Sequence, residues 1–410
     1  MKKIVFLMGG YYPVYGAGGV CLGNIIEELD SEYEIIVIAI DYKNELPQKC
    51  EYKNHKIIRI QSKWHKKECK IQSVEKQRNL LKYLFIFEKT MSFLLSRTII
   101  DKDLINCYLK ALNEITDIDV IIPTCAPFES ILASVEYKNY NDDVRIMPFL
   151  FDQFASSVGL YRNKIFYYLC KSNHIQLEEK MLKYSNRVFF TESWEDHLNT
   201  YFSSYNAMFT KIEHPILKPP KDNDKGIIKN NFIYIGSLSY YNRNPLPFLN
   251  LIMSNISEFE NYSFDFAGRG DVFDKIMLFN EKCKNIACYG VVSKKLANEM
   301  INESKYLLSF GNKDITQTPS KIFELIATGK PIIHWCTSSK DPVISILSKY
   351  PNHLILFEKD KPNIQLKKLK AFLDMEYIVL KFEKIKNDYE TALPEYTAKL
   401  LKREIEYGNL

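Results

Sequence analysis

Residues 318–331 read TPSKIFELIATGKP, and this stretch says most about the chain. Pro319 suits the first turn of a helix, because that position needs no backbone N–H donor. Ser320 follows as a candidate cap for the orphan donors of the helix, and Lys321 adds a full positive charge. The positive end of a helix dipole also favours an anion, and Glu324 comes one turn later, where it can accept paired hydroxyls. The stretch therefore predicts a helix that holds a phosphate at its tip and a sugar hydroxyl pair beside it.

The end of the same stretch fixes where this helix stops. Gly329 is typical of a residue just beyond a helix, and the run that opens at Lys330 predicts a strand. A second interpretation stays open, in which the helix is only a capped element of the core. It rests on the apolar side chains that fill most of the helix, namely Ile322, Phe323, Leu325, Ile326 and Ala327.

The size and composition of the chain predict a folded protein of two domains. It has 410 residues, of which 46% are hydrophobic and 26% charged, and its formal net charge is +5. These fractions are ordinary for a globular protein, and a chain of this length usually forms more than one domain. The small positive excess suits contact with an anionic surface but gives no reason to expect nucleic acid as a partner.

The sequence has no segment with the roughly 18 uninterrupted apolar residues that a membrane-spanning helix needs. The longest candidate, residues 80–100, contains four charged side chains. The first apolar run stops at Gly9 without a cleavage site, which favours a strand over a signal peptide. The nine cysteines include no Cys-x-x-Cys pair, so we expect reduced thiols in the cytoplasm and neither a disulfide framework nor a zinc site.

Apolar strand-like runs alternate with helical stretches along the chain, which predicts an α/β fold with parallel sheets covered on both faces. We expect strands at residues 4–8, 33–40, 120–123, 144–151, 187–191, 232–237, 263–267, 285–289, 306–310, 331–335 and 353–357. The two series predict two doubly wound domains, residues 1–215 and 226–375. We expect a linker at 215–226, which is rich in proline and charge, and helices at 376–410 that pack back on the first domain.

Ligands of open parallel sheets bind beyond the carboxyl ends of the strands, and the unusual residues of this chain stand at those ends. The first strand ends at Gly9 and leads to GAGG at residues 16–19, whose glycines let a ligand approach the backbone. A dinucleotide site with Asp41 as the ribose acid fits poorly, because the glycines follow the strand too late. Later strand ends carry Asp152, Gly236, Ser237, Arg243, Gly268, Tyr289 and Gly311.

These features together resemble the GT-B glycosyltransferases, in particular the group-one, family-4-like enzymes of bacterial surface polysaccharide synthesis. The motif Pro-Ser-Lys-x-x-Glu-x-x-x-x-Gly-Lys-Pro carries the resemblance, supported by the glycine-tipped strand ends before it. The resemblance is strongest across residues 231–357 and weaker across 1–215. It implies two facing Rossmann-like domains, with a nucleotide-sugar donor in the second, an acceptor in the first, and a C-terminal helical tail.

The resemblance also implies roles for particular residues. Glu324 matches the glutamate that binds the ribose hydroxyls, and Arg243 stands where such enzymes place a cation on the phosphates. In the first domain, Gly18 and Gly19 match a loop that faces the transferred sugar, and Asp152 matches an acidic position of some members. The other donor contacts that the resemblance implies are Gly236, Ser237, Gly268, Tyr289, Val291, Pro319, Ser320 and Lys321.

Two positions depart from the family pattern. Thr316 stands where many family-4 enzymes have a second glutamate, and residues 122–125 lack the histidine that many members carry there. These departures leave open the donor sugar and the anomeric outcome, although the resemblance favours retention of configuration over inversion.

Transfer from a nucleotide sugar needs positive charge where the diphosphate leaves, and Arg243, Lys321 and the helix tip can supply it. We therefore expect no metal ion and no other cofactor. Asp-x-Asp pairs at 101–103, 117–119 and 222–224 follow no strand and are interpreted as surface. For an inverting reaction Asp152 is the candidate general base, and its alternative is a helix cap or a plain loop residue. The alternative for Arg243 is an ordinary surface arginine.

Residues 63–97 form a basic and aromatic segment, with nine Lys or Arg against three Glu. The aromatic residues interleaved with these charges are Trp64, Tyr83, Phe85, Phe87 and Phe93. Such a segment suits the surface of an anionic membrane. The alternative is a pair of helices packed on the first domain, with its basic face in solvent.

The sequence therefore predicts a cytoplasmic glycosyltransferase, peripheral on the inner face of the cell membrane. Its donor would be a UDP- or GDP-type nucleotide sugar, and its acceptor a glycan or a lipid-linked sugar. Capsule and O-antigen assembly are the settings that the resemblance implies. Two rivals stay open: a nucleotide-sugar 2-epimerase of the same fold, which needs no acceptor, and a non-catalytic protein that binds a nucleotide sugar or a partner enzyme.

Overall fold

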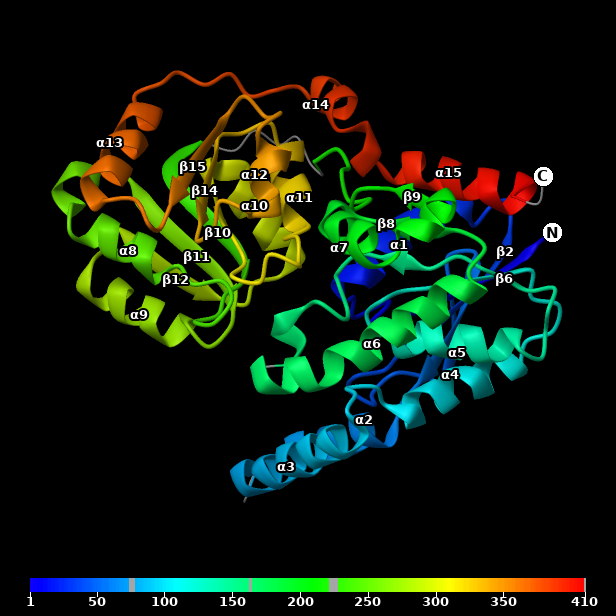
Figure 1. Cartoon of the computed structure of the whole chain (residues 1–410). Coiled ribbons are helices and arrows are strands. Elements are labelled where there is room, and N and C mark those ends of the chain that lie inside the picture. The colour runs from blue at the N-terminus through cyan, green and yellow to red at the C-terminus, as the bar shows by residue number, and fades with distance from the viewer. Residues whose placement is uncertain (74–77, 162–163, 221–227, 409–410) are drawn as a thin grey trace. The chain divides into compact units, whose positions relative to one another are not determined.

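The computed structural model describes residues 1–73, 78–161, 164–220 and 228–408. The chain divides into two compact units: unit 1 comprises Met1–Ile216 with Thr391–Leu410, and unit 2 comprises Leu217–Glu390 (Figure 1). Half of the expected linker, residues 221–226, lies outside the described part of the chain. The expected tail of helices at 376–410 is divided between the two units.

Unit 1 is built on a six-stranded sheet with the strand order β3-β4-β2-β1-β5-β6. Neighbouring strands are parallel except β3 and β4, which form an antiparallel hairpin at one edge. β1, β2 and β5 are buried along nearly their whole length, as expected of strands covered on both faces. The strands are β1 (Lys3–Met8), β2 (Glu34–Ile40), β3 (Lys49–Tyr52), β4 (His55–Ile60), β5 (Val120–Pro123) and β6 (Arg145–Ile146).

A second, three-stranded sheet of unit 1 contains β7 (Phe149–Leu150), β8 (Val188–Phe190) and β9 (Phe209–Lys211). A parallel bridge from Thr124 to Phe149 continues β5 into this sheet. The expected single strand at 144–151 is therefore wrong, because β6 and β7 belong to different sheets. Pro148 lies between them, and a proline has no N–H to continue the ladder.

The helices of unit 1 are α1 (Ala17–Leu29), α2 (Lys63–Gln72), α3 (Arg78–Ser96), α4 (Lys102–Asn113), α5 (Glu129–Lys138), α6 (Lys164–Tyr184), α7 (Glu195–Tyr201) and α15 (Pro394–Tyr407). α15 is the last helix of the chain, yet it packs against α1 near the amino terminus. Leu401 and Ile405 of α15 are buried in the same cluster as strand β1. Arg187 forms an ion pair with Glu404 at 2.9 Å, which further ties α15 to this unit.

Unit 2 contains one parallel six-stranded sheet with the order β12-β11-β10-β13-β14-β15. Counted along the chain, this order is that of a doubly wound dinucleotide-binding fold, so the predicted α/β class is confirmed. The strands are β10 (Lys229–Ser237), β11 (Ser263–Arg269), β12 (Ile286–Gly290), β13 (Ser304–Phe310), β14 (Ile332–Cys336) and β15 (His353–Phe357). The helices are α8 (Leu246–Met253), α9 (Phe273–Lys282), α10 (Lys294–Glu303), α11 (Lys321–Ala327), α12 (Pro342–Leu347), α13 (Pro362–Leu373) and α14 (Phe382–Asp388).

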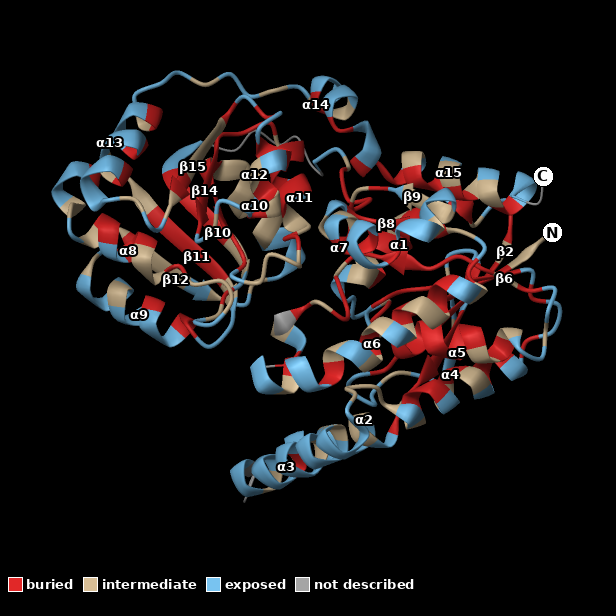
Figure 2. Cartoon of the chain, viewed as in Figure 1, coloured by how far each residue is buried: buried red, intermediate tan, exposed pale blue. Residues whose placement is uncertain are grey.

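Each unit has its own hydrophobic core, formed between the strands and the inner faces of the helices (Figure 2). The helix faces that point away from the sheets are mostly exposed, α3 most extensively. Among the helices that the structure describes, none combines the length and the apolar character needed to cross a bilayer.

Candidate functional site

A cluster of three cations lies in unit 2 around the start of α11. Lys321 is the first residue of α11, and burial lowers the pKa of its ammonium group. Glu324 opposes this shift, whereas the positive charges of Arg243 and Lys294 add to it. Lys321 Nζ has no hydrogen-bond or ion-pair partner among the described residues. Such a half-buried and unneutralised charge attracts an anion.

Arg243 is held in place by the ends of two strands. Its Nε and Nη2 donate to Asn312 Oδ1 at 3.0 and 2.8 Å, and its Nη1 donates to the carbonyl oxygen of Ser237 at 3.4 Å. Asn312 is buried after β13, and its own Nδ2 donates to the Gln317 carbonyl at 3.0 Å. These acceptors are neutral, so they orient the guanidinium without cancelling its charge.

The tip of α11 differs from the expectation in one respect. Ser320 has helical backbone angles, φ −54° and ψ −27°, and its side chain caps no backbone donor. The prediction of Ser320 as a cap is therefore wrong, because a capping residue needs an extended backbone. Since α11 has only seven residues, the attraction for an anion rests on the side-chain charges of Lys321 and Arg243 more than on the helix dipole.

Glu324 lies on the exposed face of α11, while Ile322, Phe323 and Leu325 pack into the core. Residues three apart on a helix share a face, so the Glu324 carboxylate lies on the same side as Lys321. It is therefore accessible to a ligand that binds at Lys321, as a ribose-binding acid must be.

Tyr289 and Val291 lie at and just after the end of β12, and both are exposed. β12 is two strands away from β10, whose end carries Ser237, and neighbouring strands are about 4.8 Å apart. The end of β12 is therefore roughly 10 Å across the sheet from the cation cluster. This span fits a ligand whose base and pyrophosphate are joined through a ribose.

The glycines of the strand ends have structural reasons to be glycine. A Cβ on Gly268 would lie 1.8 Å from the carbonyl oxygen of Gly236, and the φ of Gly268 is +144°. A Cβ on Gly236 would meet the hydroxyl of Tyr234 at 2.9 Å. The missing Gly268 side chain thus makes room for the protein's own backbone. Gly268 is therefore explained by backbone packing and is not evidence of a cavity for the nucleotide sugar.

In unit 1, Gly18 and Gly19 lie in the first turn of α1, close to two different segments. A Cβ on Gly19 would lie 2.0 Å from the carbonyl oxygen of Gly10, so this glycine permits a close backbone contact. A Cβ on Gly18 would meet only the ring of Phe151, at 4.0 Å. Of the two, Gly18 is the one with room for a ligand.

Asp152 follows Phe151 and is half-buried in the loop after β7. Burial, together with the charge of Asp152, raises the pKa of the Cys125 thiol to about 12. The carboxylate of Asp152 therefore lies near the end of β5. The fold brings Asp152 and Gly18 to one edge of unit 1, on either side of Phe151.

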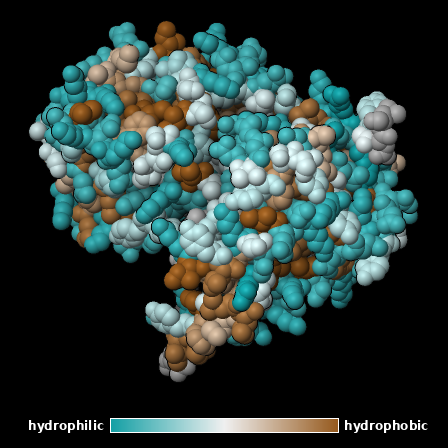
Figure 3. Space-filling view, in the orientation of Figure 1, coloured by the Kyte–Doolittle hydropathy of each residue, from teal (hydrophilic) through white to brown (hydrophobic). Residues whose placement is uncertain are grey.

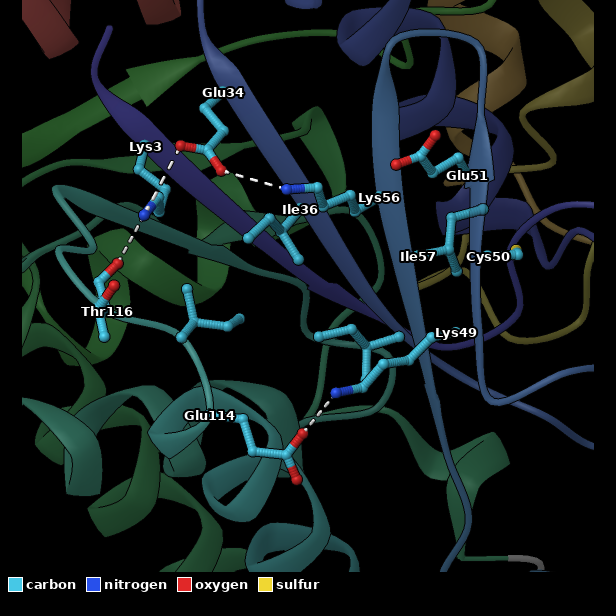
Figure 4. A pocket seen from close by; sticks show the side chains of 12 residues that line it. Lys3, Glu34, Ile36, Lys49, Cys50, Glu51, Lys56, Ile57, Glu114 and Thr116 are labelled. Carbon is cyan, nitrogen blue, oxygen red and sulfur yellow. Dashed lines mark hydrogen bonds and ion pairs between the residues drawn. The ribbon is translucent and has the colours of Figure 1, made fainter.

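A pocket of unit 1 with a volume of about 460 Å³ lies at the opposite edge of the sheet, at the amino ends of β1 and β2. Five of its charged side chains are engaged with one another, whereas Glu51 has no partner among the side chains drawn (Figure 4). Lys3 and Lys56 contact Glu34 at 3.6 and 3.7 Å, and Lys49 contacts Glu114 at 2.9 Å. These five groups neutralise one another in part, so the pocket offers no cation free to bind a diphosphate.

The cavity between Arg243 and Lys321 is much smaller. It is also lined by Tyr234 and Pro319, and its volume is about 20 Å³. This is the size of one water molecule, so a diphosphate would bind at its mouth, where Lys321 is partly exposed.

Two of the Asp-x-Asp pairs have structural roles. Asp101 caps α4 by accepting from Asp103 N and Leu104 N, and Asp119 accepts from Lys3 N at 2.6 Å. The pair at 222–224 lies outside the described residues.

Among the described residues, one His/Cys/Asp group has the spacing to hold a metal ion, namely His334, Cys336 and Asp341. His334 already has a hydrogen-bond partner for each ring nitrogen, Ser309 at 3.0 Å and Asp341 at 3.2 Å. Asp341 also caps α12 through Val343 N at 2.9 Å. These contacts explain the group as part of the unit 2 core.

Sequence reasoning missed Asn312 and Lys294. Asn312 follows Gly311, so the sequence could place it at a strand end. Its function could not be predicted, because it depends on a hydrogen bond from Arg243 in another loop. Lys294 opens α10 and has no sequence signal that separates it from the other lysines.

The sequence of the chain matches no protein-family model and no curated protein. Its structure is similar to GT-B glycosyltransferases over almost the whole chain. A sucrose-phosphate synthase from Thermosynechococcus elongatus superposes with a TM-score of 0.61 at 9% identity, covering 98% of each chain. WaaG, a glycosyltransferase of lipopolysaccharide biosynthesis, superposes with a TM-score of 0.56 at 13% identity, covering 97% of this chain and 99% of WaaG.

A third similar structure is Anabaena Alr3699/HepE in complex with UDP and glucose, with a TM-score of 0.59 at 10% identity. That match covers 98% of this chain and 100% of HepE. At such low identities these similarities define the fold of the chain, which is GT-B.

Proposed function

We propose that the chain is a glycosyltransferase that binds a nucleotide sugar in unit 2 and transfers the sugar to an acceptor bound by unit 1. The single observation that carries this proposal is that Lys321 and Arg243 line one cavity at the carboxyl edge of a doubly wound sheet, with no ion-pair partner among the described residues. Several proteins of the same fold bind nucleotides, as the UDP complex of HepE illustrates.

In the proposed reaction the bond between the sugar carbon and the diphosphate breaks, and negative charge develops on the leaving phosphate. Lys321 and Arg243 stabilise that charge. The hydrogen bonds to Asn312 hold the guanidinium of Arg243 close to the leaving phosphate. Glu324 accepts hydrogen bonds from the ribose hydroxyls. Tyr289 and Val291 border the base, roughly 10 Å across the sheet. Pro319, Ser320, Gly236, Ser237 and Gly268 shape the backbone around the pyrophosphate.

The donor is a UDP- or GDP-type sugar in this proposal, and the acceptor is a glycan or lipid-linked sugar of a surface polysaccharide such as capsule or O-antigen. Gly18 and Gly19 lie nearest the transferred sugar, and Asp152 orients the acceptor or takes its proton. The chemistry needs no metal ion or further cofactor, because the two cations can neutralise the leaving group. Retention of configuration is the favoured outcome.

An exposed apolar surface of unit 1 supports a membrane-bound acceptor. Leu80, Leu84, Phe87 and Met91 of α3 follow one another at spacings of three or four residues and are exposed, Phe87 by 65%. The start of α6 adds Ile165, Tyr168 and Leu169. Figure 3 shows this apolar face as a brown area over α3 and the beginning of α6.

The same region carries exposed positive charge. Lys66 and Lys70 of α2, and Arg97 just after α3, can meet anionic headgroups. Large exposed apolar patches on soluble proteins usually indicate an interaction site. We therefore propose that the enzyme is cytoplasmic and binds the inner face of the cell membrane through α3 and the start of α6.

A thermal-shift screen with UDP-, GDP-, CMP- and dTDP-sugars tests the proposed donor site. A ligand that binds only the folded state raises the melting temperature. We expect a UDP- or GDP-sugar to raise it for the wild type and not for Lys321→Ala. A chain that none of these sugars stabilises would contradict the proposal.

Two rival functions are separated by the products. A 2-epimerase would isomerise the nucleotide sugar in the absence of any acceptor, whereas a transferase would release nucleoside diphosphate. A non-catalytic protein would bind without either change.

Thr316 occupies the place where many family-4 enzymes have a second glutamate. Its hydroxyl donates to Asp314 at 2.5 Å, so a carboxylate lies beside that position.

A further inference from the structure

Three polar side chains of unit 1 form a hydrogen-bonded chain that the proposed donor site does not use. His197 Nε2 lies 2.6 Å from Glu178 Oε2, and His197 Nδ1 lies 2.8 Å from Ser156 Oγ. Glu178 is fully buried in α6, and His197 is buried in α7. Ser156 is half-buried in the loop after β7. Of the three side chains, only the hydroxyl of Ser156 reaches the surface.

With an ionised Glu178 and a neutral His197, the donors and acceptors of this chain have one consistent assignment. Glu178 Oε1 accepts from Ala155 N–H at 2.9 Å, so a backbone donor also holds the carboxylate. An ionised carboxylate only accepts hydrogen bonds, so Nε2 of neutral His197 carries the hydrogen and Nδ1 is left as an acceptor. The hydroxyl of Ser156 then donates to Nδ1. Ser156 Oγ has no other hydrogen-bond partner within the described part of the chain, so its lone pairs are available to a ligand.

Aromatic rings shield the inner part of this chain. The ring of His197 lies 4.9 Å from that of Tyr201, 5.5 Å from that of Trp194 and 5.9 Å from that of Phe202, measured between centroids. Hydrogen bonds in such an apolar setting are stronger than in water and hold their geometry. The same arrangement of hydroxyl, imidazole and carboxylate activates hydroxyl groups in many enzymes.

The position of Ser156 links this chain to the acceptor residues. Ser156 follows Asp152 by four residues in the loop after β7, and β7 continues β5 through the bridge from Thr124 to Phe149. Gly18 approaches Phe151 of the same loop. Ser156 therefore lies at the carboxyl edge of unit 1, where ligands of parallel sheets bind.

We propose that Ser156, His197 and Glu178 are the proton relay that deprotonates the acceptor; this inference rests on the proposed glycosyl transfer. The acceptor hydroxyl gives its proton to Ser156 Oγ while the hydrogen of Ser156 moves to His197 Nδ1. Glu178 stabilises the resulting imidazolium. The acceptor oxygen forms the bond to the sugar carbon, and the electrons of the broken bond leave with the nucleoside diphosphate. His197 and Glu178 are positioning and proton-storing residues, and Ser156 is the member of the relay that touches the acceptor.

The tautomer of His197 tests the relay without any ligand. Nitrogen NMR on the full chain with isotope-labelled histidine, at mildly alkaline pH, reports which ring nitrogen carries the hydrogen. A His197→Gln variant assigns the signal. We expect the Nε2–H tautomer. The Nδ1–H tautomer would overturn the proposal, because Ser156 could then not donate to the ring.

The second test measures turnover. UDP-glucose and GDP-mannose are the probes, water is the acceptor, and the release of UDP or GDP is the readout. Ser156→Ala keeps the pair of His197 and Glu178 intact, so we expect unchanged melting temperature and donor KM but a kcat about 100-fold lower. Glu178→Gln should lower kcat similarly, because the amide can reverse the tautomer of His197. Wild-type kcat in Ser156→Ala would overturn the relay.

Ser193→Ala is the matched control for Ser156→Ala. Ser193 Oγ donates to the Phe151 carbonyl at 3.1 Å, beside the same loop but outside the relay, so its loss should leave kcat unchanged. A wild type that binds and turns over neither sugar would contradict the proposed function. The tautomer of His197 would still decide whether the activated hydroxyl exists.

Discussion

At the carboxyl edge of the unit 2 sheet, Lys321 carries a charge that no described side chain neutralises in an ion pair. At the carboxyl edge of unit 1, by contrast, Glu178 and His197 are paired at 2.6 Å and present only a neutral hydroxyl to the surface. The first edge suits an anion on which charge develops, and the second suits the removal of a proton. Two sheets of the same architecture thus differ in chemistry because of the side chains that their loops supply.

The two edges share one structural device. In each unit a glycine lets two backbone segments approach more closely than a side chain would allow: Gly19 against Gly10 in unit 1, and Gly268 against Gly236 in unit 2. The strand ends are therefore fixed by backbone packing, which leaves the neighbouring side chains free to specialise.

Removing the charge at the unit 2 edge should have the largest effect. Lys321→Ala is expected to lower kcat/KM for the nucleotide sugar about 100- to 1000-fold, because it deletes a cation that stabilises the leaving group. The measurement is nucleoside diphosphate release at varied donor concentration. Lys295→Ala is the control, since Lys295 is exposed and its one ion pair within the described residues is with Glu299 at 3.9 Å. Turnover at the wild-type level in Lys321→Ala would assign the donor to another site.

The close backbone contact at Gly268 predicts that two Gly→Ala variants of unit 2 will differ in their free energy of unfolding. Gly268→Ala should lower the free energy of unfolding by about 3 kcal/mol, because a Cβ would strike the Gly236 carbonyl. Gly290 also has a positive φ of +63° but open space around it, so Gly290→Ala should cost only about 1 kcal/mol. Denaturant unfolding of both variants measures the difference. Equal losses would show that backbone strain, and not the close approach, decides the cost.

The apolar face on α3 and α6 predicts that the protein binds membranes through unit 1 and not through unit 2. We expect the wild type to pellet with phosphatidylglycerol vesicles at low salt. Leu84→Ser with Phe87→Ser should bind about tenfold more weakly, because two apolar side chains no longer enter the bilayer. Met375→Ser with Ile378→Ser is the control, since these are exposed apolar residues of unit 2. Failure of the wild type to bind at low salt would remove this part of the proposal.

The lowered pKa of Lys321 predicts a smaller, pH-dependent effect. Only the protonated amine attracts a diphosphate, so affinity for UDP is full below the pKa of Lys321 and declines as the pH rises through it. Because burial places this pKa below the ordinary 10.5, the decline should begin at lower pH than for an exposed lysine. Calorimetric titration of UDP at several alkaline pH values measures it. A several-fold loss that persists in Lys321→Arg would exclude Lys321 as the cause.

Much of the fold could be predicted from the sequence, because the strands of parallel sheets are continuous apolar runs bounded by glycine. Strands such as 4–8, 120–123 and 353–357 were found with at most one residue of error at either end. β3 was missed because its four residues alternate between exposed and half-buried at the sheet edge. β9 was missed because none of its residues is buried. β4 was missed because lysine and arginine interrupt its apolar run.

The candidate donor site could be predicted in part. Lys321 and Glu324 lie on one helix, where spacing of three residues fixes a common face. The support of Arg243 by Asn312 joins residues 69 positions apart, and no local pattern contains that information. The motif also misled in one detail, since Ser320 adopts helical angles and does not cap.

The sequence by itself determined the α/β class, the position of most strands and the charge at the start of α11, because each depends on residues close together in the chain. Only the tertiary structure decided that α15 packs on α1, that Arg243 is held by Asn312, and that Ser156, His197 and Glu178 meet. The physical reason is that hydrogen bonds and buried contacts between distant residues depend on how helices and strands pack. Periodicity and spacing describe only one helix or strand at a time.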